Sequence, residues 1–287
     1  TTRGCFNTCA FCVSGGEKPV RTLPLETVWQ RLEVIRRNGI QNVRVLDRTF
    51  NYHPKRAEEL LNLFTSFAPG IRFHLEIHPA LLPGEIRKIL QSLPEGLLHL
   101  EAGIQSLRSK VLETAHRAGS LESSLEGLEF LCSLSNMETH ADLIAGLPGY
   151  TYAQIVEDVY QLAAYGAGEI QLESLKLLPG TAMRKEAENL NIRYSPLPPY
   201  EVLESDSMNG DDLYMSHCLS RLLDGYYNAP TWHTITRDLL REEPRFLESF
   251  LDFLIDANVI ENPLSVEKRG ILLFSFCQKN YPEWLTN

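Results

Sequence analysis

Three cysteines lie close together near the start of the 287-residue chain, in the stretch RGCFNTCAFC. Cys5, Cys9 and Cys12 are separated by three and then by two residues. Thiolates grouped in this way are ligands of zinc or of iron–sulfur clusters. A disulfide would leave one thiol over, and the other three cysteines stand alone in apolar surroundings. The spacing therefore indicates a metal or cluster site rather than a disulfide framework.

The number of thiols separates the possible sites. Structural zinc usually has four ligands in two pairs, and a second pair is missing here. Catalytic zinc uses three protein ligands, although three thiolates from one short loop would be unusual. A cubane iron–sulfur cluster takes one cysteine at each iron, so three cysteines leave one iron open for chemistry. The steps between the cysteines reach at most about 10–14 Å, which is enough to curl around a compact cluster. Zinc and a cluster both stay open on this evidence alone.

The elements that must position this loop alternate along the first two-thirds of the chain. Apolar runs of strand length are followed by stretches of helical period. The predicted strands are 42–47, 71–77, 97–104, 139–147 and 169–178, and the predicted helices are 25–38, 54–67, 84–92, 107–117, 121–134 and 152–165. Gly39 is placed to end the first helix and Thr151 to cap the last. This order predicts βαβ units and a mainly parallel sheet.

The strand count predicts an open barrel. If residues 1–4 supply the end of a first strand, six strands are visible, which is fewer than the eight of a closed barrel. The composition then changes: residues 185–199 are expected to be a linker rich in proline, and residues 200–287 a mostly helical domain. The predicted fold is α/β, with a partial (β/α)6 barrel over residues 1–184. Because the chain starts with Thr1 just before the cysteines, we expect it to be part of a longer protein.

Charge and hydropathy exclude some classes of protein. Lysine and arginine number 27 against 37 acidic residues, a net charge of −10, which argues against a surface that coats nucleic acid. No apolar run approaches the roughly 18 residues that span a bilayer. The scattered free cysteines are typical of a reducing compartment, so a cytoplasmic protein is expected.

The cysteine loop resembles that of the radical S-adenosylmethionine superfamily, in which an aromatic residue, here Phe11, precedes the last cysteine. Four further stretches lie at strand ends in the order found in that family: DRTFN (47–51), GIQS (103–106), DLIAGLPG (142–149) and LKLLPGT (175–181). The resemblance covers about residues 1–184. It implies a [4Fe–4S] cluster on Cys5, Cys9 and Cys12, with S-adenosylmethionine at the open iron. It also implies reductive cleavage to a deoxyadenosyl radical for C–H chemistry, with flavodoxin or ferredoxin as electron donor.

The resemblance also implies roles for residues at the strand ends. Gln105 would make a polar contact to S-adenosylmethionine, and Arg117 would pair with its methionine carboxylate, which a guanidinium binds bidentately. Asp142 would accept hydrogen bonds from the ribose. Ile144 would lie against the adenine, and Phe11 near the cluster and the adenine. Taken alone, Gln105 and Asp142 could equally be strand-end caps, and Arg117 a solvated cation in the last turn of a helix.

Three more residues are candidates for the cofactor site. The family's glycine-rich stretch after the second strand is replaced here by DRTFN, so Asp47 and Thr49 are the candidates to contact the methionine amino group. Glu76 ends the third predicted strand and is expected to face S-adenosylmethionine or to anchor a loop. The histidines are scattered in the sequence, and none is assigned to a metal. The catalytic residues themselves are not identified.

Within the superfamily, the strand-end motifs are most similar to the branch whose members carry an upstream cobalamin-binding domain. That branch includes methyltransferases and proteins labelled as Mg-protoporphyrin IX monomethyl ester oxidative cyclase. The C-terminal region resembles an uncharacterised helical domain of the same branch. The chain lacks the D-x-H-x-x-G motif of cobalamin ligands, so cobalamin is expected only through a domain outside this chain.

Three classes of function follow from these expectations. The first is a radical enzyme, an oxidoreductase or methyltransferase that acts on a small-molecule substrate. The second is a non-catalytic iron–sulfur electron carrier or sensor, and the third is a zinc-stabilised binding module. Neither of the last two needs polar residues such as Gln105, Arg117 and Asp142 at the strand ends.

Overall fold

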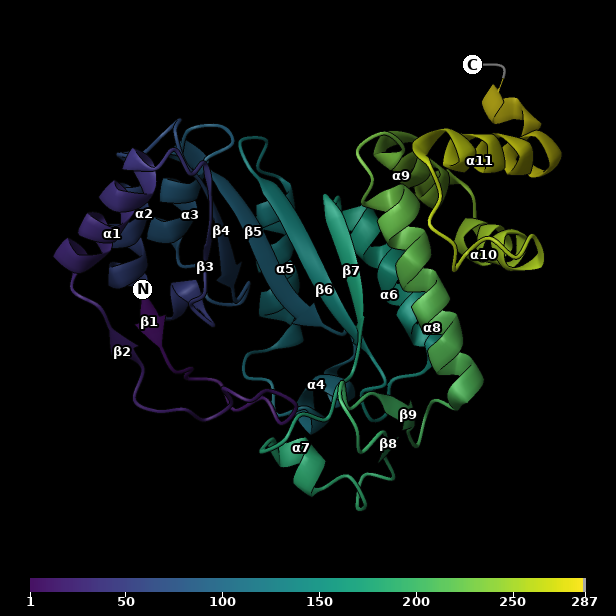
Figure 1. Ribbon diagram of the computed structural model, residues 1–287, viewed down its shortest axis with the longest axis horizontal. Coiled ribbons are helices and arrows are strands. Elements are labelled where there is room, and N and C mark those ends of the chain that lie inside the picture. Colours follow the sequence, from purple (N-terminus) through teal and green to yellow (C-terminus); the bar gives the residue numbers. More distant parts are fainter. Residues whose placement is uncertain (286–287) are drawn as a thin grey trace.

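The core of the protein is one parallel sheet of five strands in the order β3-β4-β5-β6-β7. The computed structural model describes residues 1–285. Neighbouring strands in this order are consecutive in the sheet, and Figure 1 shows the sheet as a twisted, curved surface. The strands are β3 (Asn42–Val45), β4 (Arg72–Ile77), β5 (Leu98–Gln105), β6 (Glu138–Ala145) and β7 (Glu169–Ser174). The predicted α/β fold, with a parallel sheet forming a partial barrel, is confirmed.

Helices cover the outer face of the sheet (Figure 1). They are α1 (Leu25–Arg37), α2 (Pro54–Thr65), α3 (Gly84–Ser92), α4 (Ser109–Thr114), α5 (Leu121–Cys132) and α6 (Tyr152–Tyr165), with a short 3-10 turn, η1 (Phe50–Tyr52), before α2. Alternate strand residues such as Phe73 and Leu100 are buried under them. Both predicted helix ends are confirmed: Gly39 has a φ of +69°, and Thr151 forms a capping box with Gln154.

The first strand does not join the main sheet, which therefore has five strands rather than the six expected. Thr2–Arg3 (β1) pairs antiparallel with Arg21–Thr22 (β2). The backbone N–H of Thr2 donates to the Asp47 carboxylate at 2.6 Å, just beyond the end of β3. This side-chain contact takes the place of ladder hydrogen bonds to β3, and the barrel is more open than predicted.

The segment from residue 182 to residue 204 is more structured than a linker. It contains α7 (Ala182–Lys185) and an antiparallel pair of short strands, β8 (Arg193–Tyr194) and β9 (Val202–Glu204). The helices that follow are α8 (Gly210–Leu222) with a π-helical turn η2 (Leu223–Tyr227), α9 (His233–Glu242), α10 (Phe246–Asp256), α11 (Val266–Asn280) and the 3-10 turn η3 (Pro282–Leu285). The predicted helical C-terminal part is confirmed. The last two residues of the predicted helical domain, 286–287, lie outside the described residues. None of the helices in residues 1–285 is long and apolar enough to cross a bilayer.

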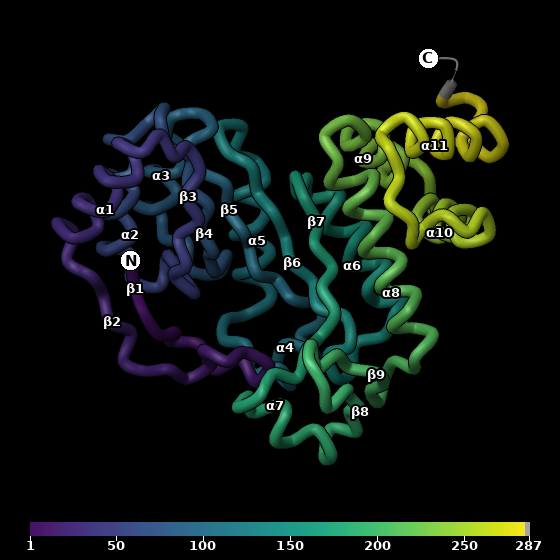
Figure 2. The backbone as a smooth tube through the Cα atoms, in the orientation of Figure 1, coloured from purple at the N-terminus to yellow at the C-terminus, as the bar shows by residue number. Residues whose placement is uncertain are grey.

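The helical part covers one edge of the sheet. Helix α8 and the turn after it run beside β7 (Figure 2). The Asn228 side chain accepts from the Ile170 N–H and donates to the Ile170 carbonyl, both at 2.9 Å. An amide thus satisfies edge groups that a further strand would otherwise pair with. Most of the C-terminal aromatics instead form the small domain's own core, in which the Phe250 ring centroid lies 4.9 Å from those of Tyr226 and Phe276.

Candidate functional site

The cysteine loop lies at the carboxyl ends of the strands, between α4 and α7 (Figure 1). Its middle is held by backbone hydrogen bonds on both sides. The Ala10 N–H donates to the Ala115 carbonyl at 2.9 Å, and the Met183 N–H donates to the Ala10 carbonyl at 2.8 Å. The Cys5 N–H donates to the Glu17 carbonyl at 3.1 Å, which closes the loop on itself. The turn after α4 and the start of α7 therefore position the loop.

Two glycines allow this closure. Gly4 has a φ of +92°, and a side chain there would collide with the Glu17 carbonyl. A Cβ atom at Gly15 would lie 2.6 Å from the carbonyl oxygen of Cys9. Asn7 adds a side-chain anchor, because its Oδ1 accepts from the Ala118 N–H at 3.0 Å. The loop is thus compact and tied to the segment that carries Arg117.

The three thiols are free and differ in exposure. Cys5 and Cys9 are buried, whereas Cys12 is half-buried. Arg117 Nη1 lies 3.7 Å from Cys9 Sγ, and Thr49 Oγ1 lies 3.8 Å from Cys5 Sγ. Burial raises the pKa of the Cys9 thiol, while the Arg117 guanidinium acts in the opposite direction. A neighbouring cation stabilises the thiolate, which is the form that ligates iron.

The spacing of the thiols distinguishes a single ion from a cluster. Sulfur ligands of one zinc ion lie about 4 Å apart, because each Zn–S bond is about 2.3 Å long and the angles are tetrahedral. Among residues 1–285, the one group of metal-ligating side chains close enough to share a single ion is elsewhere in the fold. The three cysteines are therefore spread too widely for one ion in this conformation. A loop with three free thiols fits a multi-iron cluster instead.

Three residues singled out from the sequence converge on Gly103. Arg117 Nη2 donates to the Gly103 carbonyl oxygen. A Cβ atom at this glycine would lie 2.7 Å from Gln105 Nε2 and 3.3 Å from Arg117 Nη2, so the absence of a side chain lets both groups approach. Asp142 is the β6 partner of Gly103 in the sheet register. The structure thus brings Gln105, Arg117 and Asp142 together around Gly103, and Arg117 connects this group to Cys9.

Gln105 owes its position to an irregular strand end. The register between β5 and β6 shifts between Gly103 and Gln105, and Gln105 has a φ of +73°. A residue other than glycine in this region is strained by about 1–3 kcal/mol, a cost that commonly occurs at functional sites. The bulge turns the side chain toward Arg117.

Asp142 sits on the inner face of β6, where it is largely buried. His140 Nε2 lies 2.6 Å from its Oδ1. Burial raises the pKa of the Asp142 carboxyl, and His140 opposes that shift. Asp142 is linked to the cysteine loop through Gly103 and Arg117 rather than by direct contact. Its second oxygen, Oδ2, is the atom through which it could accept hydrogen bonds from a ligand.

Asp47 and Thr49 have different surroundings. The Asp47 carboxylate is buried and accepts hydrogen bonds from the first two residues, Thr1 and Thr2. It thereby ties β1 to the end of β3, and its expected contact to a cofactor amino group stays a prediction. Thr49, whose hydroxyl lies beside Cys5, is the member of the pair that is next to a thiol.

The remaining predicted residues are Glu76, Ile144 and Phe11, of which Phe11 lies in the cysteine loop itself. Glu76 is on the inner face of β4, where Arg44 and Arg48 approach its carboxylate to 3.8 and 3.9 Å. Burial, followed by the neighbouring Glu101, raises the pKa of Glu76. Phe11 and Ile144 are partly buried and pack against the core. The cofactor roles of these three residues stay predictions.

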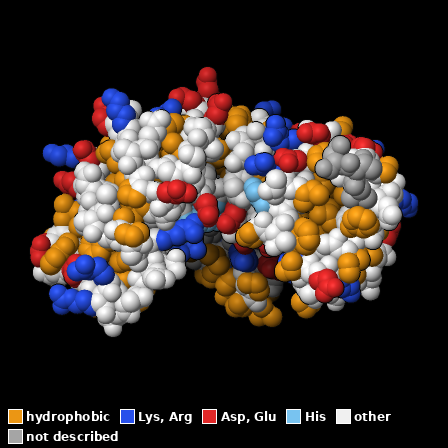
Figure 3. All heavy atoms as spheres, turned by 90° about the horizontal axis from the view of Figure 1, so that it is seen from above, with side chains coloured by type: hydrophobic (Ala, Val, Ile, Leu, Met, Phe, Trp, Pro, Cys, Tyr) orange, Lys and Arg blue, Asp and Glu red, His pale blue; other side chains and the backbone are white. Residues whose placement is uncertain are grey.

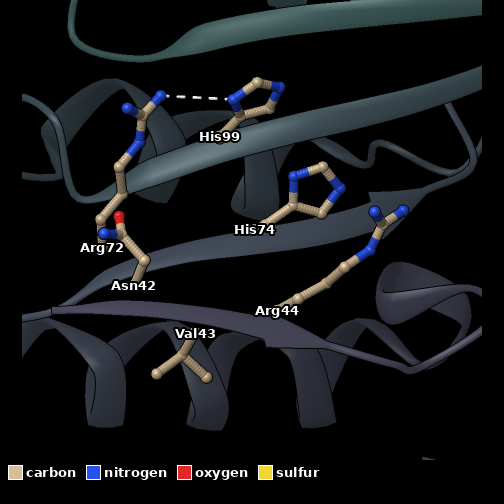
Figure 4. A pocket seen from close by; sticks show the side chains of 6 residues that line it. All are labelled: Asn42, Val43, Arg44, Arg72, His74 and His99. Carbon is tan, nitrogen blue, oxygen red and sulfur yellow. Dashed lines mark hydrogen bonds between the residues drawn. The ribbon is translucent and has the colours of Figure 1, made fainter. Parts of the chain in front are cut away.

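The sequence analysis missed a wall of polar side chains on the inner face of the sheet. It includes three histidines whose rings lie close together, with centroids 4.8 Å apart for the tilted pair His74 and His99 and 5.7 Å apart for the edge-on pair His99 and His140. A cavity of about 350 Å³ opens beside them on β3, β4 and β5 (Figure 4). Burial, with the neighbouring histidines, lowers the pKa of His99 to about 4.

The signal for this inner wall is present in the sequence. In RFHLEI and LHLEAGI, every second residue is apolar and packs under the helices, while His or Glu occupies the alternate positions. Figure 3, in which the molecule is seen from above, shows acidic, basic and histidine side chains around the hollow in the middle of the molecule. We define the inner wall as the polar side chains on this face of the sheet: Arg44, Arg72, His74, Glu76, His99, Glu101, Glu138, His140, Asp142 and Glu169.

Comparisons with known proteins support the radical chemistry expected for the cysteine loop. The model of the radical SAM superfamily matches residues 1–162, and that of a family of unknown function, DUF4080, matches residues 188–285. A tRNA-2-methylthio-N(6)-dimethylallyladenosine synthase of Acinetobacter baylyi is 28% identical over 172 residues, 55% of this chain and 35% of the relative. The ribosomal protein uS12 methylthiotransferase RimO of Myxococcus xanthus is 27% identical over 163 residues, 52% of this chain and 33% of its own. The chain spans about a third of the length of these relatives.

Solved structures share the fold. The radical S-adenosylmethionine methyltransferase TsrM from Kitasatospora setae, with cobalamin and a [4Fe–4S] cluster bound, has a TM-score of 0.59 at 18% identity, covering 74% of this chain and 42% of its own. SuiB of Streptococcus suis, bound to S-adenosylmethionine, has a TM-score of 0.53 at 15% identity, covering 66% and 45%. At these identities the likeness concerns the fold. With the family model matching more than half of the chain, the protein belongs to the radical S-adenosylmethionine superfamily, whose cofactors are a [4Fe–4S] cluster and S-adenosylmethionine.

Proposed function

We propose that the chain is the radical-generating core of an enzyme, with the cluster on Cys5, Cys9 and Cys12 and S-adenosylmethionine beside it. One observation carries the proposal. The Arg117 guanidinium lies 3.7 Å from Cys9 Sγ, and within residues 1–285 it forms no ion pair with a carboxylate of the chain. A guanidinium that is held beside the thiols and lacks an anionic partner can bind the carboxylate of the methionine moiety.

The other side chains around Gly103 have complementary tasks. Gln105 offers an amide next to Arg117, and Asp142 offers a carboxylate oxygen to the ribose hydroxyls. Thr49 is the polar group beside Cys5 for the methionine amino group. Phe11 and Ile144 supply apolar surface for the adenine. When bound, the reduced cluster and S-adenosylmethionine supply a deoxyadenosyl radical for hydrogen-atom abstraction.

The chain's part in that chemistry is positioning and exclusion of water. Backbone hydrogen bonds hold the cysteine loop against the turn after α4, and Cys5 and Cys9 are buried. A cofactor gripped at its carboxylate, amino group and ribose has little freedom to rotate, which aims its reactive carbon at one substrate position. The inner wall of the half-barrel lies next to this position and is the surface on which a substrate would rest.

The reaction that the enzyme catalyses is a more specific proposal than its membership of the superfamily. We infer an oxidoreductase or methyltransferase that acts on a small-molecule substrate, in a protein that binds cobalamin through a domain outside this chain. The strand-end motifs support this branch, and TsrM is a structural neighbour that binds cobalamin. The net charge of −10 argues against a nucleic-acid substrate, although the curated relatives are named for tRNA and ribosomal-protein modification. A reducing partner such as flavodoxin or ferredoxin supplies the electron.

Anaerobic reconstitution tests the proposal. The chain should take up about four irons and four sulfides, and with dithionite it should convert S-adenosylmethionine to methionine and 5′-deoxyadenosine, slowly because no substrate is present. A cluster whose spectrum does not respond to S-adenosylmethionine, without cleavage, would favour the electron carrier or sensor. Stoichiometric zinc without a brown chromophore would favour the zinc-stabilised module.

A further inference from the structure

A second cluster of metal-ligating side chains lies in the inner wall, away from the cysteine loop. His99 on β5, His140 on β6 and Glu169 on β7 come from three adjacent strands, and one ligand atom of each lies within 4.8 Å of the other two. His140 Nδ1 and Glu169 Oε2 are 4.0 Å apart. The sheet register brings them together, because His140 pairs directly with Glu169, and His99 pairs with Glu138, which lies two residues before His140 on the same face of β6.

Several nitrogens in this cluster lack a hydrogen-bond partner. His99 Nε2 and both ring nitrogens of His140 are buried and make no hydrogen bond, although His140 Nε2 lies within ion-pair distance of Asp142. Buried polar atoms in native proteins are nearly always paired, so several such atoms in one cluster need an explanation. The three ligand atoms lie around one place, where a bound group that reaches all of them would satisfy the orphaned nitrogens. Two imidazole nitrogens and a carboxylate match the ligand preference of a divalent cation.

The other side of each histidine is held by an acidic residue. His140 Nε2 lies 2.6 Å from Asp142 Oδ1, within ion-pair distance although the two atoms are not aligned as a hydrogen bond. A proton on Nε2 leaves His140 Nδ1 free to ligate. Arg72 Nη2 donates to His99 Nδ1 at 3.2 Å, and Glu138 Oε2 lies 3.6 Å from the same atom. Ligation through His99 Nε2 therefore requires Arg72 to release Nδ1, whose proton then turns toward Glu138. Carboxylates behind ligating histidines are the usual support of metal sites.

A further layer keeps the rings in place. His74 lies close to His99, and its Nε2 lies 2.7 Å from Glu101 Oε2. Arg44 in turn contacts the same Glu101 oxygen at 2.6 Å. Figure 4 shows Arg44, Arg72, His74 and His99 on neighbouring strands around the cavity. The side chain of His140 is 4% exposed, so its orientation is determined by packing rather than by solvent.

We propose that His99, His140 and Glu169 bind a divalent transition-metal ion such as Zn²⁺. Metal–nitrogen and metal–oxygen bonds are about 2.0–2.2 Å long, so the three atoms need to move together by about 1 Å, which rotation of Glu169 can supply. Three protein ligands leave at least one coordination position open, as in catalytic rather than structural sites. The Glu169 side chain is 34% exposed, so this position opens to the hollow of the half-barrel. The site does not depend on the cluster on the cysteine loop.

Zinc binding to the cluster-loaded chain tests this site, because the thiols are then occupied by iron. Equilibrium dialysis against Zn²⁺ should give one zinc per chain, and X-ray absorption at the zinc edge should show nitrogen and oxygen ligands at about 2.0–2.1 Å, without sulfur at about 2.3 Å. His99→Asn, His140→Asn and Glu169→Gln should each weaken binding by about 10- to 100-fold or more. His217→Asn, at an exposed histidine on α8, should bind zinc as the wild type does.

Thermal unfolding keeps the result independent of misfolding. Zn²⁺ should raise the Tm of the wild type, while Glu169→Gln, at a partly exposed position, should unfold at the wild-type temperature without zinc and gain no increase with it. Absence of zinc binding, zinc bound through sulfur, or binding that none of the three substitutions weakens would each overturn the site. If the cluster fails to assemble but zinc still binds through nitrogen and oxygen, the proposed radical function fails and this site stands.

Discussion

The two polar regions of the half-barrel are built in different ways. The rim, which we define as the cysteine loop with Thr49, Gln105 and Arg117, consists of residues beyond or at the carboxyl ends of strands. It is held mainly by backbone hydrogen bonds and by glycines at crowded positions. The inner wall consists of alternate residues within the strands and is held by side chain to side chain contacts across neighbouring strands.

These two kinds of support predict how each region responds to amino-acid substitutions. A loop held by its backbone keeps its shape when a side chain is removed, so substitutions in the rim should alter ligand binding more than stability. Side chains in the wall support one another, so a single substitution there changes the surroundings of several others. The predictions below test this separation.

The largest expected effect is loss of the cluster. Cys5→Ala, Cys9→Ala and Cys12→Ala should each abolish iron binding after anaerobic reconstitution, because each removes one of only three thiolates. Zinc bound at the inner wall should be unchanged in the same variants. Iron and zinc analysis measures both, with Cys132→Ala as a control that keeps its iron. Loss of both metals from any one cysteine variant would show that the two regions are not separate.

Acid should destabilise both regions through buried histidines. Next to the rim, His78 Nε2 contacts the carbonyl of Ala118, the residue after Arg117, at 2.9 Å, and burial, followed by Arg117, lowers the pKa of His78 from 6.5 to about 4. A lowered folded-state pKa means that the unfolded state binds more protons between these values. The stabilisation is therefore complete above pH 6.5 and is lost as the pH falls through 4. It amounts to about 3 kcal/mol, at about 1.4 kcal/mol per pH unit.

Urea unfolding between pH 7 and pH 4 measures this dependence. His78→Gln can still donate to the Ala118 carbonyl. It should reduce the pH dependence of the free energy of unfolding by about half of the histidine contribution, since His99 in the inner wall titrates in the same range. His217→Gln should leave the curve unchanged. A wild-type slope in His78→Gln would contradict the assignment.

At the rim, Arg117→Ala should weaken S-adenosylmethionine binding without loss of iron. A charge-assisted hydrogen bond is worth about 1.5–3 kcal/mol, which corresponds to about 10- to 150-fold in Kd. Arg117→Lys should lie between, because an ammonium keeps the charge but not the fork geometry. Titration of the reconstituted protein measures the Kd. Arg37→Ala, at an exposed position on α1, is the control, and an equal loss in that variant would remove the special role of Arg117.

The smallest expected effect concerns the edge of the sheet. Asn228→Ala leaves the N–H and carbonyl of Ile170 without their side-chain partner and should lower the free energy of unfolding by about 1–2 kcal/mol. Asn228→Asp retains the acceptor but loses the donor, so its cost should fall below that of Asn228→Ala unless the new charge is itself unfavourable. Neither should change the iron content. Unchanged urea unfolding in Asn228→Ala would show that solvent satisfies this edge.

Several features of the fold could be predicted because they depend on residues near one another in sequence. Period-two and period-3.6 hydrophobic patterns located the strands and helices, and Thr151 and Gly39 marked helix ends. The prediction that residues 1–4 join the main sheet is wrong, because so short a strand pairs according to the hydrogen-bonding groups that lie near it in the fold. Asp47 was expected near a cofactor, yet its carboxylate binds Thr1 and Thr2.

The cysteine loop could be recognised as a metal or cluster site from the sequence, since its three thiols lie within eight residues and their spacing alone restricts the metal chemistry. The sequence also indicated Gln105, Arg117 and Asp142 through short motifs at strand ends. The folded structure was needed to see that these three residues meet at Gly103, and that His99, His140 and Glu169 form one cluster. The physical reason is strand register: residues about 30 to 40 positions apart become neighbours only when parallel strands pair, and a shift by one residue would point them to the other face.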